Sequence, residues 1–213
     1  MKIIVNADDF GISIKVNEAI LKSFKMGLIS SSTILANGPA FEDAIRIIHE
    51  HHLENNIGVH INLTTGFPIT EDIKNIKRFC HEDGSFITKR YTSLKVFFPL
   101  NLNERKALEK EIKAQIHKCR ENGLILTHAD SHHRQHNEWN IEQSVERVLL
   151  DENIKSICLA RNCGLGINFT KRLYKTFYNY ILHANGFKTV DYFGSFEDFL
   201  YYFSKKIIFP VLL

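Results

Sequence analysis

The sequence predicts an α/β fold in which helices cover a parallel sheet. Short, β-branched apolar runs alternate along the chain with longer runs that carry apolar residues at helical spacing. Repeated strand-then-helix units of this kind form a parallel sheet, either as an open α/β sheet or as a (β/α) barrel. The chain has 213 residues and is 44% hydrophobic. This is enough for a full core, so we expect a single domain over residues 1–213.

The first half of the chain contains three predicted strands and two predicted helices. The strands are expected at residues 2–6, 31–38 and 56–64. Residues 14–26 have the apolar spacing of a helix, and Gly27 is a typical stop signal. A second helix is expected from Pro39 to about His52, because proline suits a first helical turn. Residues 65–103 are irregular, and long excursions of this kind usually carry function or partner contacts.

The second half begins with the clearest helix, at residues 103–123. It has an asparagine at its start, acidic residues early and Gly123 after its end. A strand at 124–133 then runs into a cluster of histidines. The remaining elements are expected in the order helix 140–150, strand 156–160, helix 170–184, strand 188–193 and helix 195–204.

Composition and charge exclude several classes of protein. The net charge is only +3 and the basic residues are spread along the chain, which is not typical of a nucleic-acid binder. No apolar run is long enough to span a bilayer, and the first residues lack the cleavage site of a signal peptide. The four cysteines form no CxxC pair, so we expect free thiols and a cytoplasmic protein without membrane partners.

Polar residues lie at the carboxyl ends of several predicted strands, where α/β proteins place their chemistry. Asp8 and Asp9 follow the first strand, His60 lies late in the third, and Asp130 and His132 end the fourth. Each feature alone has a structural explanation, as a turn, a satisfied core histidine or a solvated loop. Together they favour a site. One aspartate and two histidines can hold a catalytic divalent cation, while the other aspartate accepts a proton from the attacking water.

Three segments carry a family resemblance: NADDFG (6–11), GVHINLT (58–64) and THADSHHRQH (127–136). Together they resemble the YdjC-like carbohydrate deacetylases, over residues 1 to about 200. The resemblance implies a distorted (β/α) barrel, similar to a TIM barrel. It also implies a hydrolase that removes acetyl groups from N-acetylated sugars such as chitooligosaccharides. Fold resemblance does not fix the substrate, so hydrolysis of a phosphoester or cyclic amide stays open, as does a non-catalytic carbohydrate-binding remnant.

The resemblance also implies roles for individual residues. Asp8 is the expected general base, and the expected ligands of one divalent cation, zinc or magnesium, are Asp9, His60 and His132. His128 and Asp130 are expected to orient these ligands.

Substrate contacts are less well marked in the sequence. They are expected from Arg161, Asn162 and Phe10, with Trp139 as a second aromatic candidate. The structural alternatives are a solvated loop for the Arg–Asn pair and a core position for the aromatic residues.

The end of the chain departs from the family pattern. Relatives usually end in a further strand with a His-Pro pair whose histidine acts as general acid. Here no histidine follows His183, and Phe209 precedes Pro210. We therefore expect a truncated barrel without its last strand, with an intact metal site and turnover reduced by about 10²–10⁴. The open sheet edge is compatible with a homodimer. Tyr201 and its aromatic neighbours suit either that interface or the core.

Overall fold

The computed structural model describes residues 3–88, 98–162, 169–195 and 197–198. The chain divides into two compact units, Met1–Lys155 (unit 1) and Ser156–Leu213 (unit 2). The single domain expected over residues 1–213 stays a prediction. Within the described ranges, no helix is both long and apolar enough to cross a membrane.

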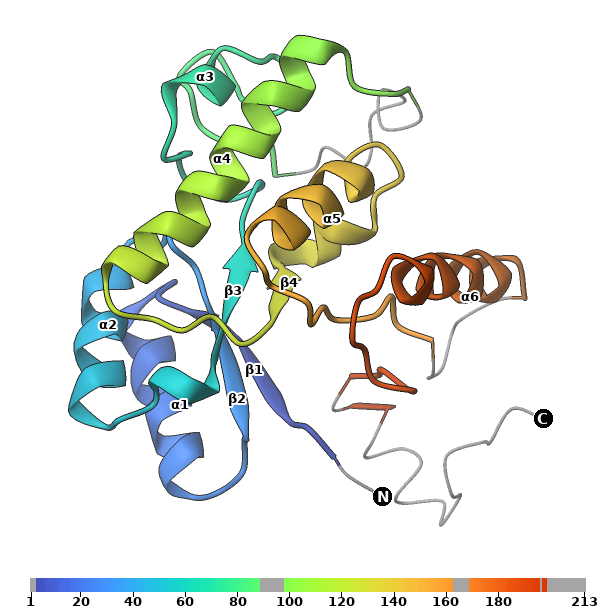
Figure 1. Cartoon of the computed structure of the whole chain (residues 1–213). Coiled ribbons are helices and arrows are strands. Elements are labelled where there is room, and N and C mark those ends of the chain that lie inside the picture. Colours follow the sequence, from blue (N-terminus) through green and yellow to red (C-terminus); the bar gives the residue numbers. More distant parts are fainter. Residues whose placement is uncertain (1–2, 89–97, 163–168, 196, 199–213) are drawn as a thin grey trace. The chain divides into compact units, whose positions relative to one another are not determined.

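Unit 1 is built on a four-stranded parallel sheet (Figure 1). Its strands are β1 (Asn6–Phe10), β2 (Ser31–Ile34), β3 (Ile57–Ile61) and β4 (Ala129–Ser131). They pair in the order β1-β2-β3-β4, so each strand lies beside the next one in the chain. A doubly wound sheet would reverse its order at a switch point, whereas a barrel winds in one direction. The predicted α/β fold is confirmed, and the strand order is that of a barrel segment.

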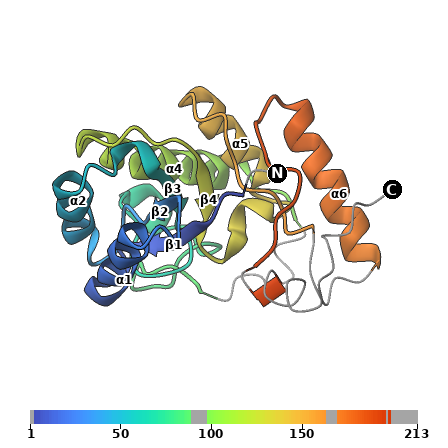
Figure 2. The ribbon, with the colours of Figure 1, turned by 90° about the horizontal axis from the view of Figure 1, so that it is seen from below.

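Helices cover one side of this sheet. α1 (Ile14–Lys25), α2 (Phe41–Glu50) and α4 (Leu102–Glu121) lie together on that side of the strands (Figures 1 and 2). α5 (Glu142–Asp151) and the short α3 (Glu71–Lys74) both pack against α4. A short 3₁₀ helix, η1 (Glu54–Asn56), precedes β3. The two best-predicted helices have local start signals, because the Ser13 side chain caps α1 and Asn101 forms a capping box with Glu104 at α4.

The central strand β3 is buried along its whole length, which explains its continuous apolar sequence. Gly58 allows β4 to approach closely, since a Cβ atom there would lie 2.5 Å from the carbonyl oxygen of His128. The pairing that results sets His60 directly opposite Asp130. A glycine in β3 therefore fixes the register on which the site depends.

The first strand is shifted from its predicted position. We expected it at residues 2–6 with Asp8 and Asp9 beyond its end, but β1 spans Asn6–Phe10 and contains both aspartates. The reason is the partner strand, because pairing with β2 begins at Asn6 opposite Ser31. Ile3 and Ile4 precede this ladder, and their side chains are exposed.

The predicted excursion at 65–103 is anchored by one buried carboxylate. Glu111 of α4 accepts hydrogen bonds from the backbone N–H groups of Ile69 (3.0 Å) and Thr70 (2.8 Å) and from the Thr70 hydroxyl (2.8 Å). Cys80 and Phe86 form an isolated antiparallel bridge further along. The loop that follows β3 is thus held to the outer helix, although residues 89–97 lie outside the described part.

Unit 2 contains α6 (Phe169–Ala184), close to the predicted helix at 170–184. The strands expected at 156–160 and 188–193 are not formed as strands, although a parallel bridge joins Ser156 to Lys188. The Asn179 side chain takes up both backbone groups of Ala160, which a sheet partner would otherwise satisfy. Most of the helix expected at 195–204 lies outside the described residues.

Candidate metal centre

Asp9 owes its orientation to an irregularity in β1. Neighbouring residues of a regular strand point to opposite faces. Here the register of β1 against β2 shifts between Ala7 and Phe10, and Asp9 has a φ of 70°. A left-handed backbone at a residue other than glycine costs roughly 1–3 kcal/mol and is most often found at functional sites. The bulge lets Asp8 and Asp9 both reach the surroundings of His60.

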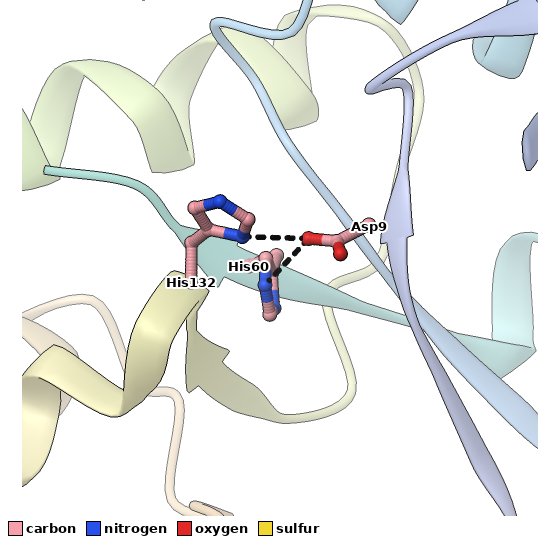
Figure 3. Close-up of side chains that lie close together, drawn as sticks. All are labelled: Asp9, His60 and His132. Atoms are coloured by element: carbon pink, nitrogen blue, oxygen red, sulfur yellow. Dashed lines mark hydrogen bonds and ion pairs between the residues drawn. The ribbon is translucent and has the colours of Figure 1, made fainter. Parts of the chain in front are cut away.

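Asp9, His60 and His132 converge from three strand ends (Figure 3). One carboxylate oxygen of Asp9, Oδ1, lies 2.7 Å from Nδ1 of His132 and 3.1 Å from Nε2 of His60. The candidate ligand atoms of the three residues all lie within 4.8 Å of one another. His60 is buried and Asp9 is partly open to solvent, so the cluster can be reached from solvent at Asp9.

The other nitrogen of His60 faces a second carboxylate. Nδ1 lies 2.5 Å from Oδ1 of Asp130, and Oδ2 of Asp130 accepts a hydrogen bond of 3.0 Å from the Thr33 hydroxyl. A carboxylate that fixes the far nitrogen of a histidine is a common support for metal ligands, because it sets the tautomer and the ring direction. Thr33 was not singled out in the sequence, since a threonine in a strand carries no motif of its own.

The charges around His60 are strongly coupled. Burial alone would lower its pKa, but Asp130 and Asp9 raise the pKa of His60 to about 10. Burial would raise the pKa of Asp9, yet hydrogen bonds with His132 and His60 hold it well below the usual range. A His60 that is protonated between two carboxylates leaves the site with net negative charge, and a divalent cation can replace that proton.

His132 begins a strained turn, the 3₁₀ segment η4 (His132–Asn137). His133 and Arg134 inside it have φ values of 55° and 57°. The Ser131 hydroxyl closes the turn, because it accepts a hydrogen bond of 2.9 Å from the His136 N–H and contacts His136 Nδ1 at 2.6 Å. The sequence could not separate His132 from His133 by spacing, but in the structure His132 is the one that contacts Asp9.

A second grouping, Asp8 with His60 and Asp130, shares one histidine with the first. It suits a cation less well, because both oxygens of Asp130 already bind His60 and Thr33. The Asp9–His60–His132 centre offers two imidazoles and one carboxylate, a donor set typical of zinc with open positions for water or substrate. The residues of this centre therefore fit a divalent cation.

Asp8 lies next to the centre in a polar network. The side-chain amide of Asn6 donates a hydrogen bond of 2.9 Å to Asp8 Oδ1. Its side-chain oxygen, Oδ1, accepts one of 2.8 Å from the Ser31 hydroxyl. His128 Nε2 lies 3.2 Å from the same Asn6 oxygen. Desolvation and the negative charge of Asp130 raise the pKa of Asp8. Asp8 is thus an accessible carboxylate with increased basicity, and His128 touches Asn6 rather than a candidate ligand.

The four residues expected to contact substrate are divided between the two units. Phe10 is fully buried in the core of unit 1, so its ring offers no face to a sugar. Trp139 is exposed. Arg161 and Asn162 belong to unit 2, where Arg161 pairs with Asp198 at 2.5 Å and Asn162 bonds to the backbone of Asp191 and Phe193. Their contact with substrate stays a prediction.

The geometry can be compared with known proteins. A family model described as YdjC-like protein matches residues 2–209. The chain belongs to the YdjC-like protein family. The three sequence segments that resemble this family supply all three residues of the centre, together with Asp8 and Asp130.

Among its YdjC-like relatives are curated bacterial proteins named carbohydrate deacetylase. One from Listeria monocytogenes serotype 4b (strain CLIP80459) is 40% identical over 134 residues, which cover 62% of this chain and 51% of the relative. One from Geobacillus stearothermophilus is 36% identical over 145 residues, 68% of this chain and 54% of the relative. The chain spans about half the length of the curated relatives it matches.

A solved structure supports the fold. It is described as a putative cellobiose-phosphate cleavage protein from Enterococcus faecalis V583. It matches with a TM-score of 0.68 and 24% identity, over 88% of this chain and 66% of its own. At 24% identity this similarity supports the α/β fold and says nothing about function.

Proposed function

We propose that this protein is a metal-dependent hydrolase that removes acetyl groups from N-acetylated sugars. The observation that carries the proposal is the convergence of Asp9, His60 and His132 on one point beside the accessible carboxylate of Asp8. The curated relatives named carbohydrate deacetylase support the substrate class.

In this proposal, Asp9, His60 and His132 hold one divalent cation, with zinc favoured by the two imidazole donors. The bound cation would supply Lewis acidity, which lowers the pKa of water and polarises an acyl carbonyl group. The protein's own side chains would position the cation's ligands and accept the proton of the attacking water.

Asp8 is the proposed general base and accepts the proton of the attacking water, a role that its raised pKa suits. Asn6 holds the Asp8 carboxylate in place through its hydrogen bond of 2.9 Å. Asp130 keeps the His60 ring turned so that Nε2 faces Asp9. The C–N bond then breaks and the leaving nitrogen takes up the proton that Asp8 accepted, so the products are acetate and a free amine on the sugar.

The test is the release of acetate from N-acetylglucosamine oligomers, measured for the metal-loaded chain and after a chelator. We expect release that stops with the chelator and returns with zinc or magnesium. Asp9→Ala should lose both metal and activity. Asp8→Asn should keep the metal and lose about 10²–10⁴ in rate. Asp72→Ala is a matched control, since Asp72 is an exposed carboxylate paired with Lys110.

Two outcomes would reject this function. Acetate release unchanged by chelator and by Asp9→Ala would remove the metal mechanism. A metal-loaded chain that hydrolyses only phosphoesters or cyclic amides in a substrate panel would keep the mechanism and change the substrate class. Sugar binding without acetate release at saturating metal would instead indicate a carbohydrate-binding protein.

A further inference from the structure

We propose that His133 donates a hydrogen bond from Nε2 to the acyl oxygen of a substrate held at the Asp9–His60–His132 centre. The inference rests on the proposed function and adds a residue that contacts the substrate. His133 is absent from the predicted site, in which His132 is the expected ligand.

The position of the ring supports this role. The His133 ring lies against that of His132, with centroids 4.1 Å apart and planes tilted by 37°. His132 in turn contacts Asp9 at 2.7 Å. His133 is exposed whereas His132 is buried, so of these two adjacent rings it is His133 that solvent and a substrate can reach.

The backbone at His133 is strained. His133 and Arg134 are consecutive left-handed residues with φ values of 55° and 57°. Such strain persists only where the surroundings enforce it, and it collects at ligand sites. Here the Ser131–His136 contacts enforce it.

One ring nitrogen is fixed and the other is available. The Thr64 hydroxyl lies 3.1 Å from Nδ1 of His133. Thr64 is fully buried, and its backbone N–H is bound to the Asn62 side chain at 3.1 Å, so the hydroxyl has a defined position. We assign the hydroxyl as the donor to Nδ1, which puts the ring hydrogen on Nε2. Within the described ranges Thr64 is the one hydrogen-bond partner of His133, which leaves Nε2 for a ligand.

The first test uses binding, so it does not depend on turnover. Acetohydroxamate is the probe, because its oxygens bind divalent cations as an acyl oxygen would. Calorimetry on the zinc-loaded full chain should show probe binding about tenfold weaker in His133→Ala, with zinc affinity unchanged within about twofold. His133→Gln, which keeps an N–H donor near the Nε2 position, should restore part of the binding. Thr64→Val should weaken binding less than His133→Ala.

The second readout is kinetic. Loss of a donor to the developing oxyanion should lower kcat by about 10²–10³, while KM should rise by no more than the roughly tenfold weakening of probe binding. His52→Ala is the matched control, because His52 is also an exposed histidine with a positive φ, of 53°, at the end of α2. It should leave probe binding and kcat unchanged.

The outcomes distinguish a failure of the His133 inference from a failure of the proposed function. If His133→Ala binds the probe and turns over substrate like the wild type, this inference is wrong and the proposed function stands. A rise in KM alone would also overturn it, since the contact would then be to another part of the substrate. If the wild-type chain binds neither zinc nor probe, the proposed function fails and this inference fails with it.

Discussion

His60 binds a different carboxylate with each of its ring nitrogens. Nε2 faces Asp9 at 3.1 Å and Nδ1 faces Asp130 at 2.5 Å. Metal ligation needs a neutral imidazole with its lone pair on the nitrogen that faces the ion. Asp130 raises the pKa of this ring, so a proton competes with the cation. Once the ring is neutral, a hydrogen on Nδ1 satisfies the Asp130 carboxylate and leaves Nε2 for the cation.

The contact between Asp130 and His60 should contribute to zinc affinity. Asp130→Asn keeps the size of the side chain but removes the charge, so zinc affinity should fall by about 10- to 100-fold. Calorimetric titration measures it. Asp43→Asn is the control, since Asp43 also accepts side-chain hydrogen bonds, from Asn17 and Arg46, on α2. Equal zinc affinity in the two variants would show that Asp130 does not orient His60.

The candidate ligands could be predicted because their residue types are unusual at strand ends. Asp9, His60 and His132 carry charge or imidazole where packing alone does not require it. The supporting residues Thr33 and Asn6 could not be predicted, because hydroxyl and amide side chains are common in strands and loops. Their importance comes from contacts between β1, β2 and β4, which no local pattern records. The two interpretations of Phe10, sugar contact and core residue, could not be separated for a related reason, since both kinds of phenylalanine look alike in sequence; in the structure Phe10 is buried.

At the scale of elements, the distance between β3 and β4 decides whether the site forms. Gly58 is the point of closest approach, as a Cβ atom would lie 2.5 Å from the His128 carbonyl oxygen. Two residues further along, His60 pairs with Asp130. A larger residue at position 58 therefore disturbs the fold and the site together.

We predict that Gly58→Ala destabilises the protein by about 1–3 kcal/mol, the usual cost of overpacking a well-packed core. Urea unfolding measures the change, and zinc affinity should fall in the same variant. Gly27→Ala is the comparison, because it has a φ of 66° but open space around its Cβ position, so it reports backbone strain alone. A Gly58→Ala protein with wild-type stability and zinc affinity would contradict this account of the register.

The sequence predicted helices better than strands, and the reason is physical. The helices at 14–26 and 103–123 carry their own caps and apolar spacing, so their bounds follow from local residues. The limits of a strand depend on its partner. β1 begins only where Ser31 is available, and β4 is limited to Ala129–Ser131 although the apolar run suggested 124–133.

At the scale of the whole molecule, residues more than 120 positions apart meet because consecutive strands lie side by side. A cation that binds Asp9, His60 and His132 links β1, β3 and the turn after β4. Binding to the folded state alone stabilises it, by about 2.7 kcal/mol at a concentration of 100 times Kd. Metal should therefore raise the Tm of the chain, and a chelator should lower it.

The stabilisation of the fold by bound zinc should increase with pH. In the metal-free chain the pKa of His60 is raised to about 10, from about 6.5 when unfolded. Protonated His60 thus stabilises the metal-free fold fully below about pH 6.5, and this contribution disappears as the pH rises towards 10. Because the cation must displace this proton, apparent zinc affinity should rise by up to about tenfold per pH unit between pH 6 and 7.5.

Thermal unfolding with and without zinc across this pH range measures the effect. His60→Ala is the control, since it removes both the proton and the ligand and should show no zinc-dependent shift in Tm. A shift in the wild type that shrinks as the pH rises would mean that zinc does not compete with the His60 proton.

The most direct measurement is anomalous diffraction at the zinc absorption edge from crystals of the zinc-loaded chain. We predict one strong peak with Asp9, His60 Nε2 and His132 Nδ1 each about 2.0–2.2 Å away. A peak bound by other residues, or no peak beside Asp9 at saturating zinc, would contradict the proposed metal centre.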